Sequence, residues 1–589
     1  MLKIFKFLKW YHYVFILFIL LFIYIQVRLD LMLPEYMGNI IKIIGNAYQT
    51  GENQTSAILS EGLWMLLVTF GSIVSTIIAS YFAARVGTRA ANITRKKLFS
   101  HVQGFSLEEV NEFTTPSLIT RSTNDIQQVQ MALIIMLRLI FRAPIMAIAA
   151  ILKVTSLNLS MTMVIVGGVV AIIMMVTVIF IIVGPKFTKL QERTDDLNEV
   201  TRETLTGLRV IRSHNAQDVQ DAKFEGVNTR LTKTHVFVNT AMSFLNPGMT
   251  LVFNGLNVAL IVVGATLISQ NLLGSTPIEG LAIQIEFISY GMMIMMSFMM
   301  LIMMFIFLPR AFVSARRIMK VIETPYKIDD RHADEFQMPS DIDIEFKNVC
   351  FKYPNAEACV IKNINFKVNK GETLAFIGST GSGKSTIIQL LLRFYDVTEG
   401  EILINGINIK KYPLETLYKI MGYVPQKGLL FSGTVRENML IGNKDASDEA
   451  IIKALEIAQI KDFIDDNEQG LDYLIDQGGK NVSGGQKQRL SIARALVKQP
   501  KIYIFDDSFS ALDYKTDKQL RSNLKSKVKD ALNVIVGQRI GTIMDADQII
   551  VLDQGDIVGH GTHHELLATC KAYQEIAYAQ LSKEELANG

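Results

Sequence analysis

Cysteine is scarce in this sequence of 589 residues, which contains only Cys350, Cys359 and Cys570. Their irregular spacing excludes a disulfide framework and predicts reduced thiols on the cytosolic side. A strong excess of one charge is also absent, because the formal net charge is only +3 at pH 7. This near balance excludes a strongly basic chain, so we expect no nucleic acid among the partners.

Long apolar runs are absent after about residue 310, whereas six occur before it. A helix needs about 20 apolar residues to cross the hydrocarbon core of a membrane, and each run is long enough. The predicted spans are 13–33, 59–81, 132–152, 161–183, 244–269 and 283–308. We therefore predict that the first half of the chain lies in a lipid bilayer.

Basic residues are concentrated in the loops 82–131 and 184–243, whereas the alternate loops contain few, such as Lys42 and Lys153. Positively charged loops stay on the cytoplasmic side, so both termini are predicted to be cytosolic in a multi-pass plasma (inner) membrane protein. The two basic loops are also long and helical in pattern. We expect the spans that flank them to extend into the cytosol.

A stretch rich in charged and turn-forming residues separates the membrane part from a more polar part. We predict a transmembrane domain over residues 1–320, a linker over 321–340, a soluble domain over 341–580 and a polar tail over 581–589. The soluble domain opens with DIDIEF, in which Ile342, Ile344 and Phe346 alternate with acids. This alternation is typical of a half-buried strand.

The stretch GSTGSGKS follows an apolar run and precedes an amphipathic segment, so GxxxxGK[ST] occurs in its strand, loop and helix context. Glycines let backbone N–H groups curl around phosphates, Lys384 adds positive charge, and the Ser385 hydroxyl is suited to Mg²⁺. The predicted nucleotide contacts here are Gly378, Ser379, Thr380, Gly381, Ser382, Gly383, Lys384, Ser385 and Thr386. A phosphate loop alone leaves kinases, GTPases and transporters open.

A second anion-binding pattern occurs in NVSGGQKQRLSIARAL, residues 481–496, where a serine and two glycines precede a helical segment. Such a helix start presents backbone dipoles to a phosphate. The domain has only one phosphate loop but a second helix start suited to phosphate. This is explained if the second helix start binds a nucleotide that is held by the phosphate loop of another domain.

On these motifs the chain resembles the ATP-binding cassette (ABC) family, and six spans followed by one cassette resemble the half-transporter of ABC exporters. The resemblance covers nearly the whole chain. It implies an α-helical six-span transmembrane domain followed by an α/β P-loop nucleotide-binding domain with an antiparallel β subdomain.

The resemblance also implies a role for each matching residue, with ATP and Mg²⁺ bound. Tyr353 resembles the aromatic residue that stacks on adenine, and Gln426 resembles the Q-loop residue that reaches Mg²⁺. Asp506 resembles the Walker B acid, which would hold the metal together with Ser385 and Gln426. The signature motif is matched by Ser483, Gly484, Gly485 and Gln486, and the D-loop is matched by residues 510–513, which end at Asp513.

Two positions depart from the family pattern. Asp507 stands where the general base is normally glutamate, and Gln538 stands where the switch histidine is expected. Shortening the acid by one methylene withdraws the carboxylate by about 1 Å, a displacement that can cost on the order of 10²-fold in rate. Gln538 can hydrogen-bond a γ-phosphate but cannot carry an imidazolium charge. We predict that the catalytic set Lys384, Asp507 and Gln538 binds ATP and hydrolyses it poorly.

The intact signature motif predicts a partner chain. In this family each composite site takes its Walker motifs from one chain and its signature from the other. The resemblance therefore implies a heterodimer with a second half-transporter that has an intact Walker B glutamate and switch histidine. The alternative is a homodimer in which both changes are neutral.

The family resemblance implies ATP-driven efflux of amphipathic drugs or other hydrophobic small molecules. A lipid or peptide exporter of the same architecture is the alternative cargo class. A nucleotide-gated regulatory membrane ATPase is an alternative function.

Several residues of the predicted spans stand out by type. Arg138 and Arg142 lie one turn apart in the third span, where we favour structural pairing over cavity lining. Glu286, near the outer end of the sixth span, is suited to cation binding or proton coupling, but we expect it to be hydrated at the headgroup level. The many methionines between Met292 and Met304 suit either helix packing or a surface that repacks around different apolar molecules.

Overall fold

The computed structural model describes residues 2–330, 341–354, 356–528 and 530–581. It divides into two compact units, Met1–Val102 with Pro116–Thr324, and Gln103–Thr115 with Pro325–Gly589. The second half of the predicted linker, 331–340, and nearly all of the predicted tail lie outside the described residues.

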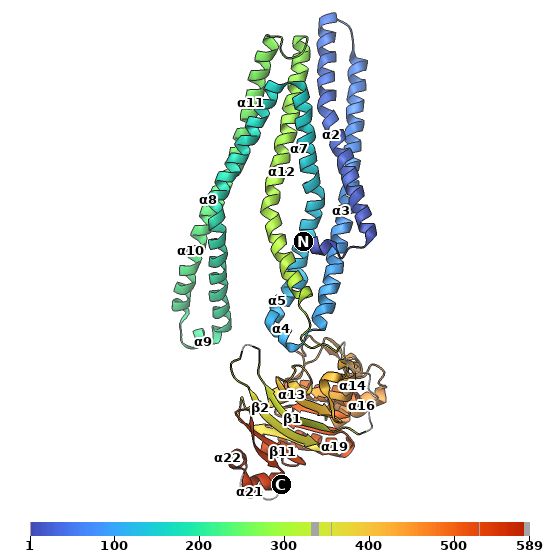
Figure 1. Ribbon diagram of the computed structural model, residues 1–589, viewed down its shortest axis with the longest axis vertical. Helices are drawn as coiled ribbons and strands as arrows, with labels where there is room; N and C mark the ends of the chain where they lie inside the picture. The colour runs from blue at the N-terminus through green and yellow to red at the C-terminus, as the bar shows by residue number, and fades with distance from the viewer. Residues whose placement is uncertain (1, 331–340, 355, 529, 582–589) are drawn as a thin grey trace. The chain divides into compact units, whose positions relative to one another are not determined.

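The described part of the first unit is helical (Figure 1). Six continuous helical stretches are long and apolar enough to cross a membrane, and each overlaps one predicted span, so the six-span prediction is confirmed. The helices are α1 (Leu2–Phe5), α2 (Trp10–Thr50), α3 (Thr55–Gln103), α5 (Thr115–Thr120), α6 (Ile126–Ile135), α7 (Phe141–Leu157), α8 (Leu159–Thr206), α9 (Leu208–Ser213), α10 (Gln217–Ser243), α11 (Leu245–Ser269) and α12 (Pro277–Glu323). Two π-helical turns, η1 (Arg121–Asp125) and η2 (Met136–Ile140), join α5, α6 and α7.

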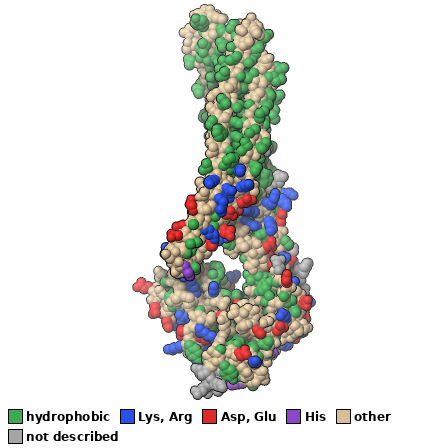
Figure 2. Space-filling model, turned by 90° about the vertical axis from the view of Figure 1, so that its left-hand side faces the viewer, with side chains coloured by type: hydrophobic (Ala, Val, Ile, Leu, Met, Phe, Trp, Pro, Cys, Tyr) green, Lys and Arg blue, Asp and Glu red, His purple; other side chains and the backbone are tan. Residues whose placement is uncertain are grey.

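The surface of these helices separates apolar from charged regions along their length. Figure 2 shows hydrophobic side chains over the upper part of the helices and Lys, Arg, Asp and Glu gathered over their lower ends. A wide apolar band next to a charged end is the arrangement expected for helices that cross a bilayer and continue into water.

Ion pairs connect α2 to α7. Arg142 Nη2 lies 3.3 Å from Asp30 Oδ2, and the Ser72 hydroxyl donates a hydrogen bond to the other oxygen of Asp30. Lys153 forms a second pair with Glu35. The predicted structural pairing of Arg142 is therefore confirmed, whereas Arg138 lies in η2 with its side chain exposed.

The prediction that Glu286 is simply hydrated is wrong. Its residue surface is only 7% exposed, because α12 packs against α2 at this level. A β-carbon on Gly38 of α2 would lie 2.3 Å from Glu286 Oε1, so the glycine permits this close approach. The outer end of the sixth span is therefore a helix interface at Glu286.

The second unit contains two principal sheets, which confirm the predicted nucleotide-binding fold. The antiparallel sheet has the order β2 (Ile361–Val368), β1 (Ile344–Phe351), β4 (Glu399–Ile404), β5 (Ile407–Asn408). The larger sheet has the order β12 (Asp556–Gly561), β11 (Gln548–Asp553), β3 (Thr373–Gly378), β10 (Leu532–Val536), β9 (Ile502–Asp506), β6 (Met421–Val424). Its strands are parallel except for β12, and a short pair is formed by β7 (Gly433–Thr434) and β8 (Leu474–Ile475).

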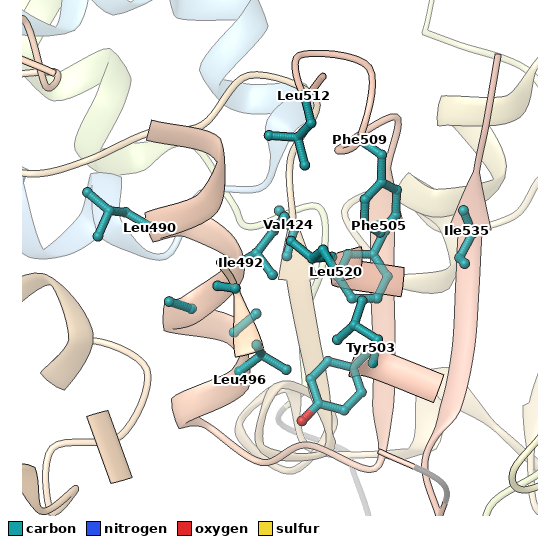
Figure 3. Close-up of a cluster of buried hydrophobic side chains, with 14 of the residues drawn as sticks. Val424, Leu490, Ile492, Leu496, Tyr503, Phe505, Phe509, Leu512, Leu520 and Ile535 are labelled. Carbon is teal, nitrogen blue, oxygen red and sulfur yellow. The ribbon is translucent and has the colours of Figure 1, made fainter. Parts of the chain in front are cut away.

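Helices surround the larger sheet. They are α13 (Lys384–Leu391), α14 (Leu414–Ile420), α15 (Val435–Leu440), α16 (Asp448–Ile457), α17 (Lys461–Asp465), α18 (Gly484–Val497), α19 (Tyr514–Lys527), α20 (Ile540–Ile543), α21 (His563–Thr569) and α22 (Lys571–Gln580), with short 3₁₀ turns η3 (Ile409–Lys411) and η4 (Gly470–Asp472). Figure 3 shows side chains of β9, including Phe505, packed with Val424 of β6, Ile492 of α18 and Leu520 of α19. Burial on both faces explains why β9 is a continuous apolar run.

Helix α4 (Leu107–Phe113) belongs to the second unit, although it lies between α3 and α5 in the chain. Ser106 begins it as an N-cap in a capping box with Glu109. The Lys327 backbone N–H donates to Glu109 Oε1 at 2.6 Å, and Asn111 Nδ2 donates to Tyr395 Oη at 3.1 Å. These contacts attach α4 to residues that follow the membrane unit by sequence.

Candidate nucleotide site

The predicted site residues meet at one edge of the larger sheet. The phosphate loop follows β3, Gln538 follows β10, Asp506 ends β9 with Asp507 next to it, and Gln426 follows β6. Strands β3, β10, β9 and β6 are adjacent and parallel, so their carboxyl ends lie side by side. Ligands of open parallel sheets bind at this edge.

The phosphate loop is shaped by glycine. Gly383 has φ 101° and begins α13, and a β-carbon there would lie 2.5 Å from Ile361 Cδ1. A side chain is excluded both by this contact and by the left-handed backbone. The Lys384 ammonium donates to the carbonyl oxygens of Gly378 at 2.8 Å and Ser379 at 2.7 Å, which holds its charge at the loop.

Ser385 and Asp506 form the part of the site that suits a divalent cation. The Ser385 hydroxyl donates to Asp506 Oδ1 at 3.3 Å, so a hydroxyl and a carboxylate oxygen lie together. Hard oxygen donors of this kind fit Mg²⁺, which takes its other ligands from phosphates and water. The described residues contain no group of three or more His, Cys, Asp and Glu arranged as a metal site. The residues present therefore fit Mg²⁺ when ATP is bound.

Two amide side chains hold the carboxylate of Asp507. Gln426 Nε2 donates to Asp507 Oδ2 at 3.1 Å, and Gln538 Nε2 donates to the same oxygen at 2.8 Å. The Asp507 backbone lies in the left-handed region with φ 49°, a conformation that aspartate tolerates better than most residues. Both departures from the family pattern therefore contact each other.

Burial changes the acidity of the charged groups at this edge. It lowers the pKa of Lys384, although Asp507 and Asp506 oppose this effect. Burial raises the pKa of Asp506, with the Ser385 hydrogen bond acting in the opposite direction. It also raises the pKa of Asp507, against the effect of Gln426. Two desolvated carboxylates beside one ammonium make a site that favours additional positive charge.

The predicted signature and D-loop residues begin two helices. Ser483 caps α18 in a capping box, in which it accepts from Gln486 N at 3.3 Å and Gln486 Oε1 accepts from Ser483 N at 2.8 Å. Ser483 and Gly484 are exposed, and Gly485 is the second residue of α18. Asp513 caps α19 through Thr516 N.

The chain is similar to known proteins over most of its length. The family model described as "ABC transporter" matches residues 361–510, and the model described as "ABC transporter transmembrane region" matches residues 16–279. An uncharacterized ABC transporter ATP-binding protein of Mycobacterium tuberculosis is 36% identical over 535 residues, which are 90% of each chain. The chain belongs to the ABC transporter family.

Two further similarities concern exporters of this family. An ATP-dependent lipid A-core flippase of Haemophilus influenzae is 31% identical over 519 residues, with 86% of each chain covered. The structure of a bacterial Atm1-family ABC exporter with ATP bound shares the fold, with a TM-score of 0.79, 24% identity, and coverage of 95% of this chain and 97% of that one. The ABC transporter described here is an exporter half-transporter, a multi-pass membrane protein whose cytosolic nucleotide-binding domain drives export with ATP.

Gln488 is a positioning residue of this ABC transporter that the sequence reasoning missed. It lies on α18 and is buried, and its Nε2 donates to Pro425 O at 3.0 Å while its Oε1 accepts from Gly428 N at 2.8 Å. These two bonds tie the loop around Gln426 to the signature helix. A polar residue two positions after Gln486, at the start of an otherwise buried helix face, is the signal that could have indicated it.

Tyr353 of this ABC transporter lies next to the phosphate-loop helix. Its hydroxyl is 3.0 Å from Thr386 Oγ1 and donates to Gln389 Oε1 at 3.1 Å, and its ring meets that of Tyr395 edge to face at 5.4 Å. The ring is therefore held in place by α13 and by the aromatic residues around it.

Replacing Tyr353 with Ala is expected to weaken ATP binding by about 1 to 3 kcal/mol, by analogy with bases stacked on aromatic side chains. Titration of the ABC transporter pair with a fluorescent ATP analogue measures the change. Tyr353→Phe is the matched control, because it keeps the ring and loses only the bonds to Thr386 and Gln389. Unchanged affinity in the alanine variant would contradict the stacking role.

Proposed function

We propose that this chain is one half of a heterodimeric exporter, and that the site built on its own phosphate loop binds ATP but hydrolyses it slowly. The observation that carries the proposal is the pair of amides on Asp507 Oδ2. A general base must point a free oxygen at the attacking water in hydrogen-bond geometry. Here the shortened carboxylate already accepts two hydrogen bonds on one oxygen.

The residues for ATP binding remain suited to their roles. In the proposed mechanism the backbone N–H groups of residues 378–383 and the Lys384 ammonium bind the phosphates, and Tyr353 orients the adenine. Ser385, Asp506 and Gln426 would hold Mg²⁺, which when bound neutralises charge on the phosphate oxygens. Gln538 donates a neutral hydrogen bond where a protonated histidine would stabilise developing charge. ATP binding would therefore be retained while the hydrolytic step is impaired.

The other half of the proposal concerns the partner. Ser483 and Gly484 are exposed, and a β-carbon on Gly484 would meet nothing within 4 Å in this chain. That open helix start supports a role in completing the composite site of a second half-transporter with a Walker B glutamate and a switch histidine. Both termini are proposed to be cytosolic, with the bilayer around the six helical stretches.

For the cargo we propose amphipathic or hydrophobic small molecules. A lipid is the second candidate, favoured by the similarity to the lipid A-core flippase. A measurement of ATP-dependent transport in reconstituted vesicles distinguishes an export pump from a nucleotide-gated regulatory ATPase. Reconstituted pump must accumulate its cargo against a gradient when ATP is added, whereas a gated ATPase must not.

The test is the ATPase activity of the purified chains, alone and mixed. This chain alone is expected to hydrolyse ATP on the order of 10²-fold more slowly than the mixed pair, given the displaced base. Mixing with the partner should restore activity. A stable homodimer with vigorous hydrolysis that depends on Asp507 would overturn the proposal.

A further inference from the structure

The loop that carries Gln538 is held by a side chain from a distant part of the chain. Gln580 is the last residue of α22, and its amide forms two hydrogen bonds to the backbone of this loop. Its Nε2 donates to Gln538 O at 2.8 Å, and its Oε1 accepts from Ile540 N at 2.8 Å. One amide group therefore bridges the backbone on both sides of Arg539.

The bond to Ile540 caps a helix. Ile540 is the first residue of α20, and the first N–H groups of a helix have no acceptor within it. The N-cap side chain often supplies that acceptor, but arginine has only donors. Accordingly, Arg539 makes no capping hydrogen bond to α20 in the part of the chain that the structure describes. Gln580 supplies the acceptor from another helix, which fixes the start of α20 relative to α22.

Helix α22 is itself anchored in the core. Tyr573 and Ala577 are fully buried, and they belong to the same hydrophobic cluster as Ile535 of β10 and Ile540 of α20. The position of Gln580 is thus set by packing, although its own side chain is exposed. An amide at the surface adds only modestly to folding stability, so stability alone does not explain two matched bonds to one loop.

The side chains of the same loop are directed to the turn after β9. Gln538 Nε2 donates to Asp507 Oδ2 at 2.8 Å, and Arg539 Nη2 donates to Ser510 O at 3.3 Å. The Ser510 hydroxyl in turn donates to Asp507 O at 2.9 Å. The loop is therefore held by α22 through its backbone, while its side chains contact the carboxylate of the candidate nucleotide site.

We propose that Gln580 is a positioning residue of this nucleotide site. By fixing the backbone on both sides of Arg539, it directs the Gln538 amide towards Asp507 and towards the γ-phosphate of ATP. The inference rests on the proposed binding of ATP at this chain's own phosphate loop, and it adds a residue that acts only through Gln538. Because ADP has no γ-phosphate, release of the loop should weaken binding of the triphosphate and leave binding of ADP unchanged.

The experiment uses the complete heterodimer and photocrosslinking with labelled azido-ATP, after which the two chains are separated. The competitors are ADP and adenylyl imidodiphosphate, a triphosphate that is not hydrolysed, and the concentration that halves the labelling of this chain is measured for each. Gln580→Leu is expected to raise this concentration about fivefold to thirtyfold for the triphosphate, as the loss of one or two hydrogen bonds does. The value for ADP should not change.

Two further variants separate positioning from stability. Gln574 lies on the same helix, but its Nε2 donates to Leu567 O at 2.7 Å and so ties α22 to α21. Gln574→Leu should leave the values for both competitors unchanged. Gln580→Glu keeps the shape and the acceptor for Ile540 N, but it places a second acceptor against Gln538 O. It should therefore lose the preference for the triphosphate as Gln580→Leu does, even if the leucine variant folds poorly.

The outcomes separate this inference from the proposed function. Equal weakening of both competitors in Gln580→Leu and Gln580→Glu, or no weakening of either, would overturn the positioning role. The same selective loss in Gln574→Leu would also overturn it, because the effect would then belong to α22 as a whole. Vigorous ATP hydrolysis by this chain alone would overturn the proposed slow site, while a selective loss in the Gln580 variants would still support the role of Gln580.

Discussion

Replacing the Walker B glutamate of the partner chain with glutamine is expected to abolish most ATP turnover of the heterodimer, whereas Asp507→Asn in this chain should lower it only slightly. The reason is the geometry around Asp507, whose Oδ2 already accepts hydrogen bonds from Gln426 and Gln538. With the base impaired as proposed, removing its charge should delete little remaining catalysis. Steady-state phosphate release by the reconstituted pair measures both variants.

The matched control for this prediction is the restoration of the missing groups. Asp507→Glu combined with Gln538→His should make this chain's own site hydrolyse ATP even when the partner's base is removed. Each single change is expected to restore less, because a longer acid would still meet the Gln538 amide. Strong loss of turnover with Asp507→Asn, equal to that of the partner variant, would show that the two sites are equivalent.

Lys384→Ala is expected to weaken ATP binding at this chain's site about tenfold to a hundredfold, because a hydrogen bond to a charged group contributes about 1.5 to 3 kcal/mol. Lys384 is the phosphate-loop lysine, and its ammonium lies at the carbonyls of Gly378 and Ser379. Photocrosslinking with labelled azido-ATP, followed by separation of the two chains, measures occupancy of this site alone.

Lys427→Ala is the matched control, since Lys427 is an exposed lysine next to Gln426 with no assigned contact to nucleotide. It should crosslink like the unmodified chain. Because Lys384 also donates to loop carbonyls, thermal unfolding without nucleotide must be compared as well. Wild-type labelling of a normally folded Lys384→Ala chain would contradict the assignment.

The residues of the candidate nucleotide site could be found from the sequence because their signals are local. A phosphate loop needs glycines and a lysine at fixed spacing, and the strand that precedes it must be apolar because it is buried on both faces. The same holds for the six spans, since the length of an apolar run alone meets the requirement of the bilayer. Predictions of this kind do not depend on which distant residues pack together.

The remaining features depend on contacts between distant parts of the chain. Gln488 and the loop around Gln426 are separated by about 60 positions, so the local pattern can mark Gln488 as unusual but cannot show which loop it contacts. The burial of Glu286 is decided by Gly38 on another helix, so the local pattern near a membrane surface wrongly predicted hydration. Likewise, the sequence analysis included residues 103–115 in the transmembrane domain, whereas they belong to the second unit, where α4 is hydrogen-bonded to Lys327 and Tyr395.

That grouping has a mechanical consequence. The chain passes between the two units three times, after residues 102, 115 and 324, so three covalent connections join them. A single connection would act as a swivel, about which one unit could turn without load on the other. The three connections lead directly into α3, α5 and α12, so rotation of the nucleotide-binding unit must apply torque to the ends of these helices. Load on the nucleotide-binding unit can thus reach the membrane helices as tension in the backbone itself.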